Sequence, residues 1–339
     1  MRALALAVLC LALAACAVRP PPPAPDAFRW PPPPDPARLV FRAWIATLDD
    51  LRPPTALDRW AKRLDRGARG APPLFLKPYD LAAAQGRVVV SDTAAGRVLI
   101  LDLAGHRAIP VDGGSEPLAR PLGVALDGRG RLYVVDGGRG EVRVFDPWGH
   151  ALMRLGAGRL LRPRDVAVSA DGERLYVLDV AGPGDPRHRL VVLNAAGRQV
   201  DEWGGRGRAP GQFNLPNQVA VGPGGEVVVL DAGNFRVQVF APDGTPLRRF
   251  GQIGRAPGDL ARPRGLAVDG DGRIYVTDAA FQNFQIFDAQ GRLLLAVGGA
   301  GEAPGRFGLP AGIAVDESGH LFVADQLHRR LSVFRLLPP

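Results

Sequence analysis

The sequence predicts an all-β protein: a six-bladed β-propeller of four-stranded antiparallel blades, closed by an N-terminal strand that joins the last blade. Two observations predict this fold. An aspartate that ends an apolar run recurs at spacings of about 43 to 52 residues, the range of one propeller blade. The clearest copy also holds four short apolar runs separated by Asp- and Gly-rich breaks, which indicates strands joined by tight turns, and this unit recurs along the chain. The recurring aspartates are Asp92, Asp136, Asp179, Asp231, Asp278 and Asp325.

The copy at 262–298 shows the pattern most clearly, with expected strands within 262–269, 274–278, 284–288 and 293–298. Its runs are apolar almost throughout, so both faces of each sheet need cover. Sheets stacked around an axis provide that cover, because each blade lies between two neighbours. An open solenoid would need polar caps at its ends, and the sequence shows none. The third copy differs from the others by an insertion at 182–186 in its second-to-third strand loop.

Three segments of this copy carry a family resemblance: Pro-x-Gly-Leu-Ala-Val-Asp at 263–269, Ile-Tyr-Val-Thr-Asp at 274–278 and Phe-Gln-Ile-Phe-Asp at 284–288. They resemble NHL repeats, and so do the segments 121–146, 216–240 and 310–334. The resemblance covers roughly residues 78–336 in six copies. It implies a six-bladed propeller and says little about activity, because one fold serves many functions.

Residues 1–15 are predicted to be a lipoprotein signal peptide. Arg2 precedes an apolar run that is too short to span a bilayer and ends in small residues. The sequence Leu13-Ala14-Ala15-Cys16 resembles the bacterial lipobox, which implies cleavage before Cys16 and lipidation of that residue. An ordinary signal peptide with a chance cysteine is the alternative. The resemblance implies a lipid-anchored protein of the bacterial cell envelope. Because Ala17 replaces the aspartate that retains lipoproteins at the inner membrane, we expect the outer membrane, facing the periplasm.

Between the signal and the repeats lie two further segments. Residues 16–37 are proline-dense and predict a semi-rigid tether. Residues 38–77 hold a strand at 39–46 and a helix at 55–64 that packs on the rim or docks a partner. The last copy stops after Phe334 without a fourth strand, so we expect 39–46 to fill that place and close the ring. The propeller itself is assigned to 78–339.

The net charge of +8 and the pI of about 10.4 predict attraction to anionic lipids, glycans or acidic proteins. A general coding bias toward arginine is an alternative explanation. No cluster of aromatic and basic residues of the kind that stacks bases is visible, so no nucleic-acid partner is expected. The five histidines show no spacing typical of a metal site, and we expect no cofactor and no metal. A monomer is expected.

The repeated aspartates are interpreted as acceptors of backbone N–H groups at turns, in preference to an axial ring of carboxylates. Function is sought instead where the copies differ. The residues just after each blade-opening proline should lie at the mouth of the central channel, and there the middle copies become polar. This predicts a cup for an anionic or hydrogen-bonding ligand. Its candidate residues are Arg164, Asp165, Asn217, Gln218 and Arg264, with Asn234, Gln282, Asn283 and His328 at the rim.

These features predict an envelope-anchored binding or scaffold module for a protein or glycan. No catalytic residue is assigned. The alternative is a hydrolase or lyase, with or without a metal, because six-bladed propellers include lactonases, amidating lyases and streptogramin lyases. These enzymes collect their reactive groups around the axis, and linear spacing cannot show such a gathering.

Overall fold

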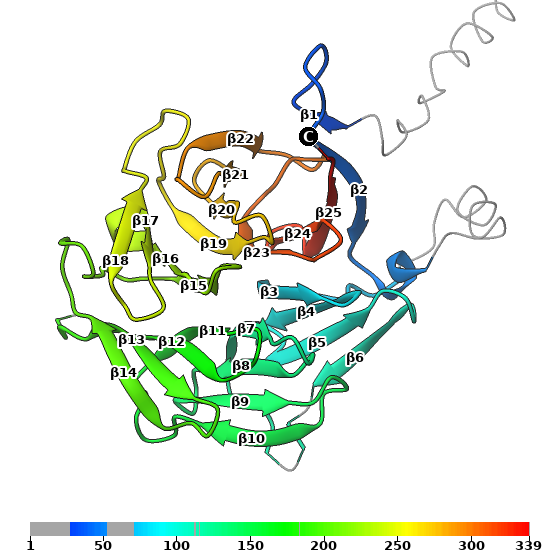
Figure 1. The fold of residues 1–339 in the computed structure, drawn as a ribbon. Helices are drawn as coiled ribbons and strands as arrows, with labels where there is room; N and C mark the ends of the chain where they lie inside the picture. Colours follow the sequence, from blue (N-terminus) through cyan, green and yellow to red (C-terminus); the bar gives the residue numbers. More distant parts are fainter. Residues whose placement is uncertain (1–27, 53–70, 112, 115, 183, 339) are drawn as a thin grey trace, which may run out of the picture.

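Six antiparallel sheets are arranged around one axis in the computed structural model, which describes residues 28–52, 71–111, 113–114, 116–182 and 184–338 (Figure 1). In every blade the first strand is innermost.

Blade 1 comprises β3 (Pro78–Ala84), β4 (Arg87–Asp92), β5 (Arg97–Asp102) and β6 (Arg107–Val111), and blade 2 comprises β7 (Pro121–Leu126), β8 (Leu132–Asp136), β9 (Glu141–Phe145) and β10 (Ala151–Leu155). Blade 3 comprises β11 (Pro163–Val168), β12 (Arg174–Val180), β13 (His188–Asn194) and β14 (Gln199–Gly204), and blade 4 comprises β15 (Gln218–Val221), β16 (Val227–Asp231), β17 (Arg236–Phe240) and β18 (Pro246–Phe250). Blade 5 comprises β19 (Pro263–Val268), β20 (Ile274–Asp278), β21 (Asn283–Phe287) and β22 (Leu293–Gly298), and blade 6 begins with β23 (Pro310–Val315), β24 (His320–Asp325) and β25 (Arg330–Leu336).

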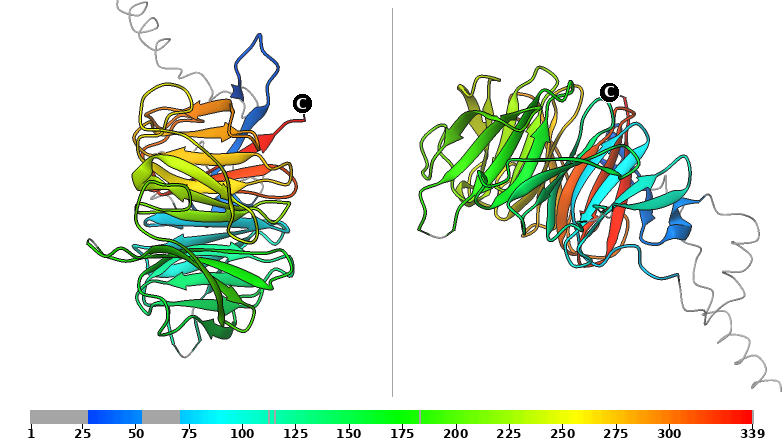
Figure 2. Two further views of the ribbon diagram at one scale, coloured as in Figure 1. Left: turned by 60° about the vertical axis from the view of Figure 1, so that its left-hand side comes forward. Right: turned by 90° about the horizontal axis from the view of Figure 1, so that it is seen from below.

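The blades pack face to face, as Figure 2 shows from two further directions. Each inner strand contacts the next one around the ring, and β23 contacts β3, so the ring is closed. One cluster of buried apolar side chains lies between each pair of neighbouring blades. The middle strands are accordingly buried along their whole length, as in β8, β16 and β20. This explains the continuous apolar runs of the sequence, since both faces of each sheet are covered.

The N-terminal strand closes the ring as the sequence predicts. Strand β2 (Leu39–Ile45) pairs antiparallel with β25 and places Phe41 opposite Phe334. Both rings are buried and lie edge to face, with centroids 5.7 Å apart. A short strand, β1 (Arg29–Trp30), pairs with β2 and adds a fifth strand to blade 6. Strand β1 lies within the segment 16–37 that was expected to be a tether.

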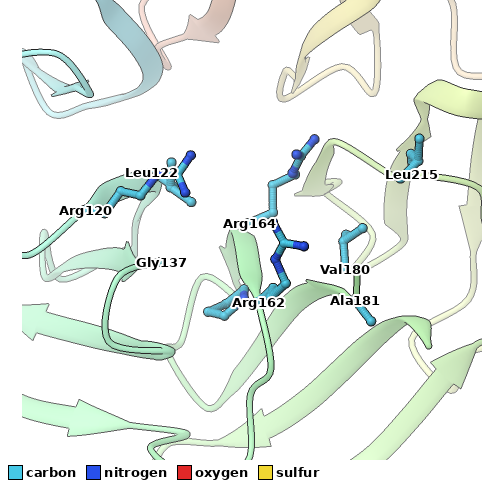
Figure 3. A pocket seen from close by; sticks show the side chains of 9 residues that line it. Arg120, Leu122, Gly137, Arg162, Arg164, Val180, Ala181 and Leu215 are labelled. Carbon is cyan, nitrogen blue, oxygen red and sulfur yellow. The ribbon is translucent and has the colours of Figure 1, made fainter. Parts of the chain in front are cut away.

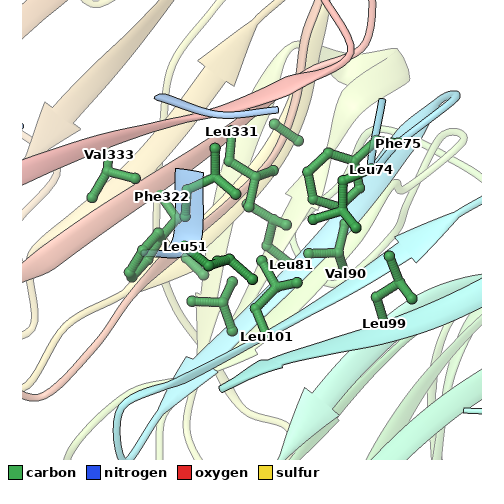
Figure 4. Packing of buried hydrophobic residues seen from close by; sticks show 14 of the residues in the cluster. Leu51, Leu74, Phe75, Leu81, Val90, Leu99, Leu101, Phe322, Leu331 and Val333 are labelled. Atoms are coloured by element: carbon green, nitrogen blue, oxygen red, sulfur yellow. The ribbon is translucent and has the colours of Figure 1, made fainter. Parts of the chain in front are cut away.

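The chain next fills the seam between blades 6 and 1 (Figure 4). Leu51, in the 3-10 turn η2 (Leu48–Leu51), and Phe75 pack against Leu81 of blade 1 and Leu331 of blade 6 in one cluster. The same N-terminal segment therefore completes blade 6 and covers the joint to blade 1. The predicted helix 55–64, the signal 1–15 and Cys16 lie outside the described residues.

In the part of the chain that the structure describes, no helix has the length and apolar character needed to cross a membrane.

Candidate functional site

The repeated aspartates position the segments that lead into the inner strands. Each aspartate is fully buried at the end of its blade's second strand. In blade 1, Asp92 accepts the backbone N–H groups of Leu76 and Lys77 at 2.6 and 2.9 Å. The other five repeat this bond with the residues at the matching places of their own blades. The interpretation of these aspartates as acceptors of backbone N–H groups is therefore confirmed, although these bonds reach the segment before the inner strand. Asp92, Asp136 and Asp278 also accept N–H groups from the turn that follows them. The aspartates hold one face of the propeller in a common geometry.

That face carries an outer ring of cations. The residue before the blade-opening proline is basic in four blades and leucine in the other two, and all four basic residues are exposed. We define the mouth as the residues directly before and directly after the six blade-opening prolines, which are Pro78, Pro121, Pro163, Pro216, Pro263 and Pro310. The outer-ring residues are Lys77, Arg120, Arg162, Leu215, Arg262 and Leu309.

The residues directly after the prolines form a tighter ring. Arg164 donates from Nη1 to Oδ1 of Asn217 at 2.9 Å, and the Asn217 amide donates to the backbone oxygen of Arg264. The guanidinium groups of Arg164 and Arg264 are half-buried. Burial lowers the pKa of Arg264, and the nearby charges of Arg262 and Arg164 lower it further. This ring consists of Tyr79, Leu122, Arg164, Asn217, Arg264 and Ala311.

The six cations of the mouth have no acidic partner among the residues that the structure describes. Neither the four cations of the outer ring nor Arg164 and Arg264 form an ion pair there. Elsewhere in the blades arginines are commonly paired, as Arg236 is with Asp231 at 2.8 Å. Uncompensated like charges repel one another, so an anion that enters the mouth removes that repulsion.

Two adjoining cavities hollow this face. They measure about 170 and 210 Å³ and share Arg120, Leu122 and Arg164 in their walls. Figure 3 shows the larger cavity, where Arg120, Arg162 and Arg164 project toward the same space beside Leu122 and Leu215. The mouth thus offers several guanidinium groups to one ligand, and a guanidinium can hold a carboxylate or phosphate through two hydrogen bonds.

The residues one position further along the inner strands form the floor of the mouth. Three of them are polar and three are glycines: Asp80, Asp165 and Gln218, and Gly123, Gly265 and Gly312. Asp80 accepts the Val124 N–H at 2.9 Å and Asp165 accepts the Val219 N–H at 2.8 Å, each from the next blade. Gln218 donates across the axis to Asp80 and accepts the Leu266 N–H at 2.5 Å. The floor therefore ties neighbouring blades together at the axis.

The glycines make room for these side chains. A Cβ atom on Gly123 would overlap Oδ1 of Asp165, and one on Gly312 would overlap the backbone of Asp80. These glycines are needed for the close approach of neighbouring inner strands near the axis.

Both floor carboxyl groups have raised pKa values. Burial raises the pKa of Asp80 to about 6, and hydrogen bonds from Val124 and Gln218 oppose the rise. Burial, and next the charge of Asp80, raise the pKa of Asp165 well above its usual value. Two buried carboxyl groups that are close together ionise less easily than a single one, because the charge of the first opposes the ionisation of the second. On the far side of the floor the channel continues as a cavity of about 190 Å³ lined by all six inner strands.

The structure divides the predicted site residues among three places. Arg164, Asn217 and Arg264 lie in the mouth as expected, whereas Asp165 and Gln218 lie one layer deeper in the floor.

The predicted rim residues hold loops together and line neither mouth cavity. Asn234 donates to the Gly207 carbonyl oxygen, Gln282 donates to that of Gly308, and His328 contacts Asp325 at 2.6 Å. Asn283 pairs with Gly298 in the sheet.

Two sets of residues were missed from the sequence. They are Asp80 and the four outer-ring cations Lys77, Arg120, Arg162 and Arg262. Each of them stands at a fixed distance along the sequence from a blade-opening proline, and this spacing could have identified them. Among the described residues, no three His, Cys, Asp or Glu side chains gather as a possible metal-binding group.

Sequence comparisons identify the repeats. The NHL repeat family matches residues 118–145 and 213–240, and a family described as a 6-bladed β-propeller matches residues 265–337. Two human proteins match over short stretches. The E3 ubiquitin-protein ligase TRIM32 is 47% identical over 45 residues, and NHL repeat-containing protein 3 is 36% identical over 69 residues. These matches cover 13% and 20% of this chain, and only 7% and 19% of the length of those proteins.

Solved propellers share the fold. A gluconolactonase from Xanthomonas campestris superposes with a TM-score of 0.57 at 22% identity, covering 78% of this chain and 88% of the enzyme. Virginiamycin B lyase from Staphylococcus aureus, in a catalytically inactive form with quinupristin, superposes with a TM-score of 0.56 at 12% identity, covering 78% and 83%. At these identities the likeness concerns the fold alone. Six matching blades, two recognised repeats and a closed ring identify the chain as a six-bladed β-propeller that carries NHL repeats.

Proposed function

We propose that this propeller is a binding module of the bacterial cell envelope whose mouth captures an anionic group of a protein or glycan partner. The observation that supports the proposal is the double ring of six cations without acidic partners in the described structure. Cations that are unpaired and partly desolvated bind anions more strongly than exposed, paired ones. Arg164 and Arg264 are the half-buried members, so they should contribute most.

The envelope location rests on the sequence. The lipobox-like Leu13–Cys16 segment and the proline-dense segment after it support a lipid anchor with a spacer. Labelling cells with a fatty acid analogue tests the anchor: Cys16→Ala should remove the label. A labelled Cys16→Ala protein would contradict lipidation at this residue.

The anion proposal is tested with two probes, an oligogalacturonate as acidic glycan and an oligoglutamate as acidic peptide. We expect binding that weakens as salt rises, because screening reduces attraction between charges near the surface. Reversing both charges (Arg164→Glu with Arg264→Glu) should weaken binding at least about tenfold, since each reversal replaces attraction by repulsion.

The matched control carries the same change in net charge away from the mouth. Arg198 and Arg249 are both exposed and belong to outer parts of blades 3 and 4. The variant Arg198→Glu with Arg249→Glu should keep the affinity within about twofold if the mouth is the site. Equal losses in the two variants would show a general charge effect and contradict the proposal. The two probes distinguish a glycan partner from a protein partner.

A second candidate function, a hydrolase or lyase, is favoured by the floor. A carboxyl group whose pKa lies near neutrality can act as a general acid or base, and burial raises that of Asp80 to about 6. Turnover of gluconolactone or of quinupristin by the wild-type protein, lost in Asp80→Asn, would support this function. The circular dichroism spectrum of the variant checks that it is folded.

A further inference from the structure

The larger mouth cavity combines cations and leucines in its wall. Figure 3 shows Leu122 beside Arg120 at one end and Leu215 at the opposite end, with Arg162 and Arg164 between them. The cavity measures about 210 Å³, which is larger than a bare carboxylate or phosphate group requires. A ligand that fills it must offer a charge to the arginines and an apolar group to the leucines.

Leu215 is held in the cavity wall in an unfavourable conformation. Its φ of +47° lies in the left-handed region, which an L-residue with a branched side chain rarely adopts, and Pro216 restricts it further. Its side chain is nevertheless 50% exposed, so burial does not offset this strain. Single exposed leucines are ordinary in proteins, but a strained one in a cavity wall is not.

A buried histidine fixes this conformation. The backbone N–H of Leu215 donates to Nδ1 of His188 at 3.1 Å. His188 is 1% exposed, and burial lowers its pKa, which keeps the ring neutral and Nδ1 able to accept. His188 begins β13, directly after the insertion at 182–186 that only blade 3 carries. A feature specific to one blade therefore positions Leu215.

We propose that the ligand of the mouth is an amphipathic anion: one carboxylate or phosphate held by Arg162 and Arg164, joined to a compact apolar group that lies on Leu215. The proposal rests on the anion-binding function above and names the ligand class. The same chemistry occurs in a free organic acid and in the C-terminal residue of a protein when that residue is apolar. Leu215 determines the preference for the apolar group.

The test compares acetate with hexanoate, which carry the same charge, by calorimetry or by NMR titration. Hexanoate should bind about tenfold more tightly, because several methylene groups leave water on the leucines. Hexanol, with no charge, should not bind measurably. Acetyl-Gly-Gly-Leu with a free carboxylate and the same peptide as an amide show whether a chain terminus can supply the anion.

Leu215→Gly gives the sharpest variant, because glycine adopts positive φ without strain and removes the apolar side chain. The ratio of hexanoate to acetate affinity should fall to about one, while the melting temperature stays equal or rises. Leu327→Ala is the matched control: Leu327 is an exposed leucine, 65% accessible, outside the cavity wall. It should keep the tenfold ratio.

The results separate this inference from the function on which it rests. Equal affinities for acetate and hexanoate, or an unchanged ratio in Leu215→Gly, would overturn the inference even if the charge reversal of Arg164 and Arg264 abolishes binding of the acidic probes. If the charge reversal leaves those probes bound, the anion-binding function itself fails.

Discussion

Removing the ring of Phe41 should weaken the whole propeller, because this residue belongs to the strand that closes it. Phe41 is 3% exposed and contacts Phe334, Trp44 and Phe28. Full burial of such a side chain contributes roughly 1.5–3 kcal/mol, and the cavity left by Phe41→Ala raises the cost to about 3–5 kcal/mol. The loss should be global, since β2 covers the edge of blade 6 and its continuation covers the seam to blade 1.

The assay is urea unfolding followed by circular dichroism, with the free energy of unfolding as the readout. Leu152→Ala is the control: Leu152 is 50% exposed on the outer strand β10, and its loss should cost less than about 0.5 kcal/mol. A double-mutant cycle with Phe334→Ala should show a coupling of about 0.5–1.5 kcal/mol for the edge-to-face pair. A cost below about 1 kcal/mol for Phe41→Ala would refute the role of β2 in closure.

Two further predictions use the same unfolding assay. Asp278→Ala removes a buried acceptor from the N–H groups of Ala261 and Arg262 and should cost about 2–3 kcal/mol, whereas Asp288→Ala, at an exposed turn, should cost less than about 1 kcal/mol. Equal costs would contradict the positioning role of the buried aspartate. The second prediction concerns pH: because the folded-state pKa of Asp80 is raised, its contribution to stability is complete below about pH 4 and is lost as the pH rises through about 6. Asp80→Asn, which cannot ionise, should therefore gain stability relative to the wild type as the pH rises from 4 to 7, by roughly 1–3 kcal/mol, and a constant difference over that range would contradict the raised pKa of Asp80.

The fold could be predicted because its signal is local and repeated. Five copies each contain four strand patterns, the sixth contains three, and all six carry the aspartate at the end of the second strand. The closing strand was also predictable, since 39–46 had no repeat of its own and the last copy lacked one strand. The added strand β1 was not predicted, because a two-residue strand carries too little pattern to separate it from a proline-rich linker.

The candidate site could be predicted only in part. The divergence after each proline drew attention to Arg164, Asn217 and Arg264, which the structure joins by hydrogen bonds. It could not show that Asp165 and Gln218 lie one layer deeper, because neighbouring strand residues point to different sides and the tilt of the strand decides which reaches the axis. The rim assignment of Asn234 and Gln282 assumed that polar loop residues face a ligand, whereas they bond to the loop backbone.

The sequence by itself determined the sheets, their number and the closure, since strand patterns, turn residues and a repeat length follow from neighbours along the chain. Only the tertiary structure decided the chemistry at the axis. Arg120, Arg164 and Arg264 are far apart in the chain, and they line one cavity because the blades close into a ring. The raised pKa values of Asp80 and Asp165, and the strained Leu215 held by His188, likewise depend on contacts between blades, and such contacts leave no mark on local sequence.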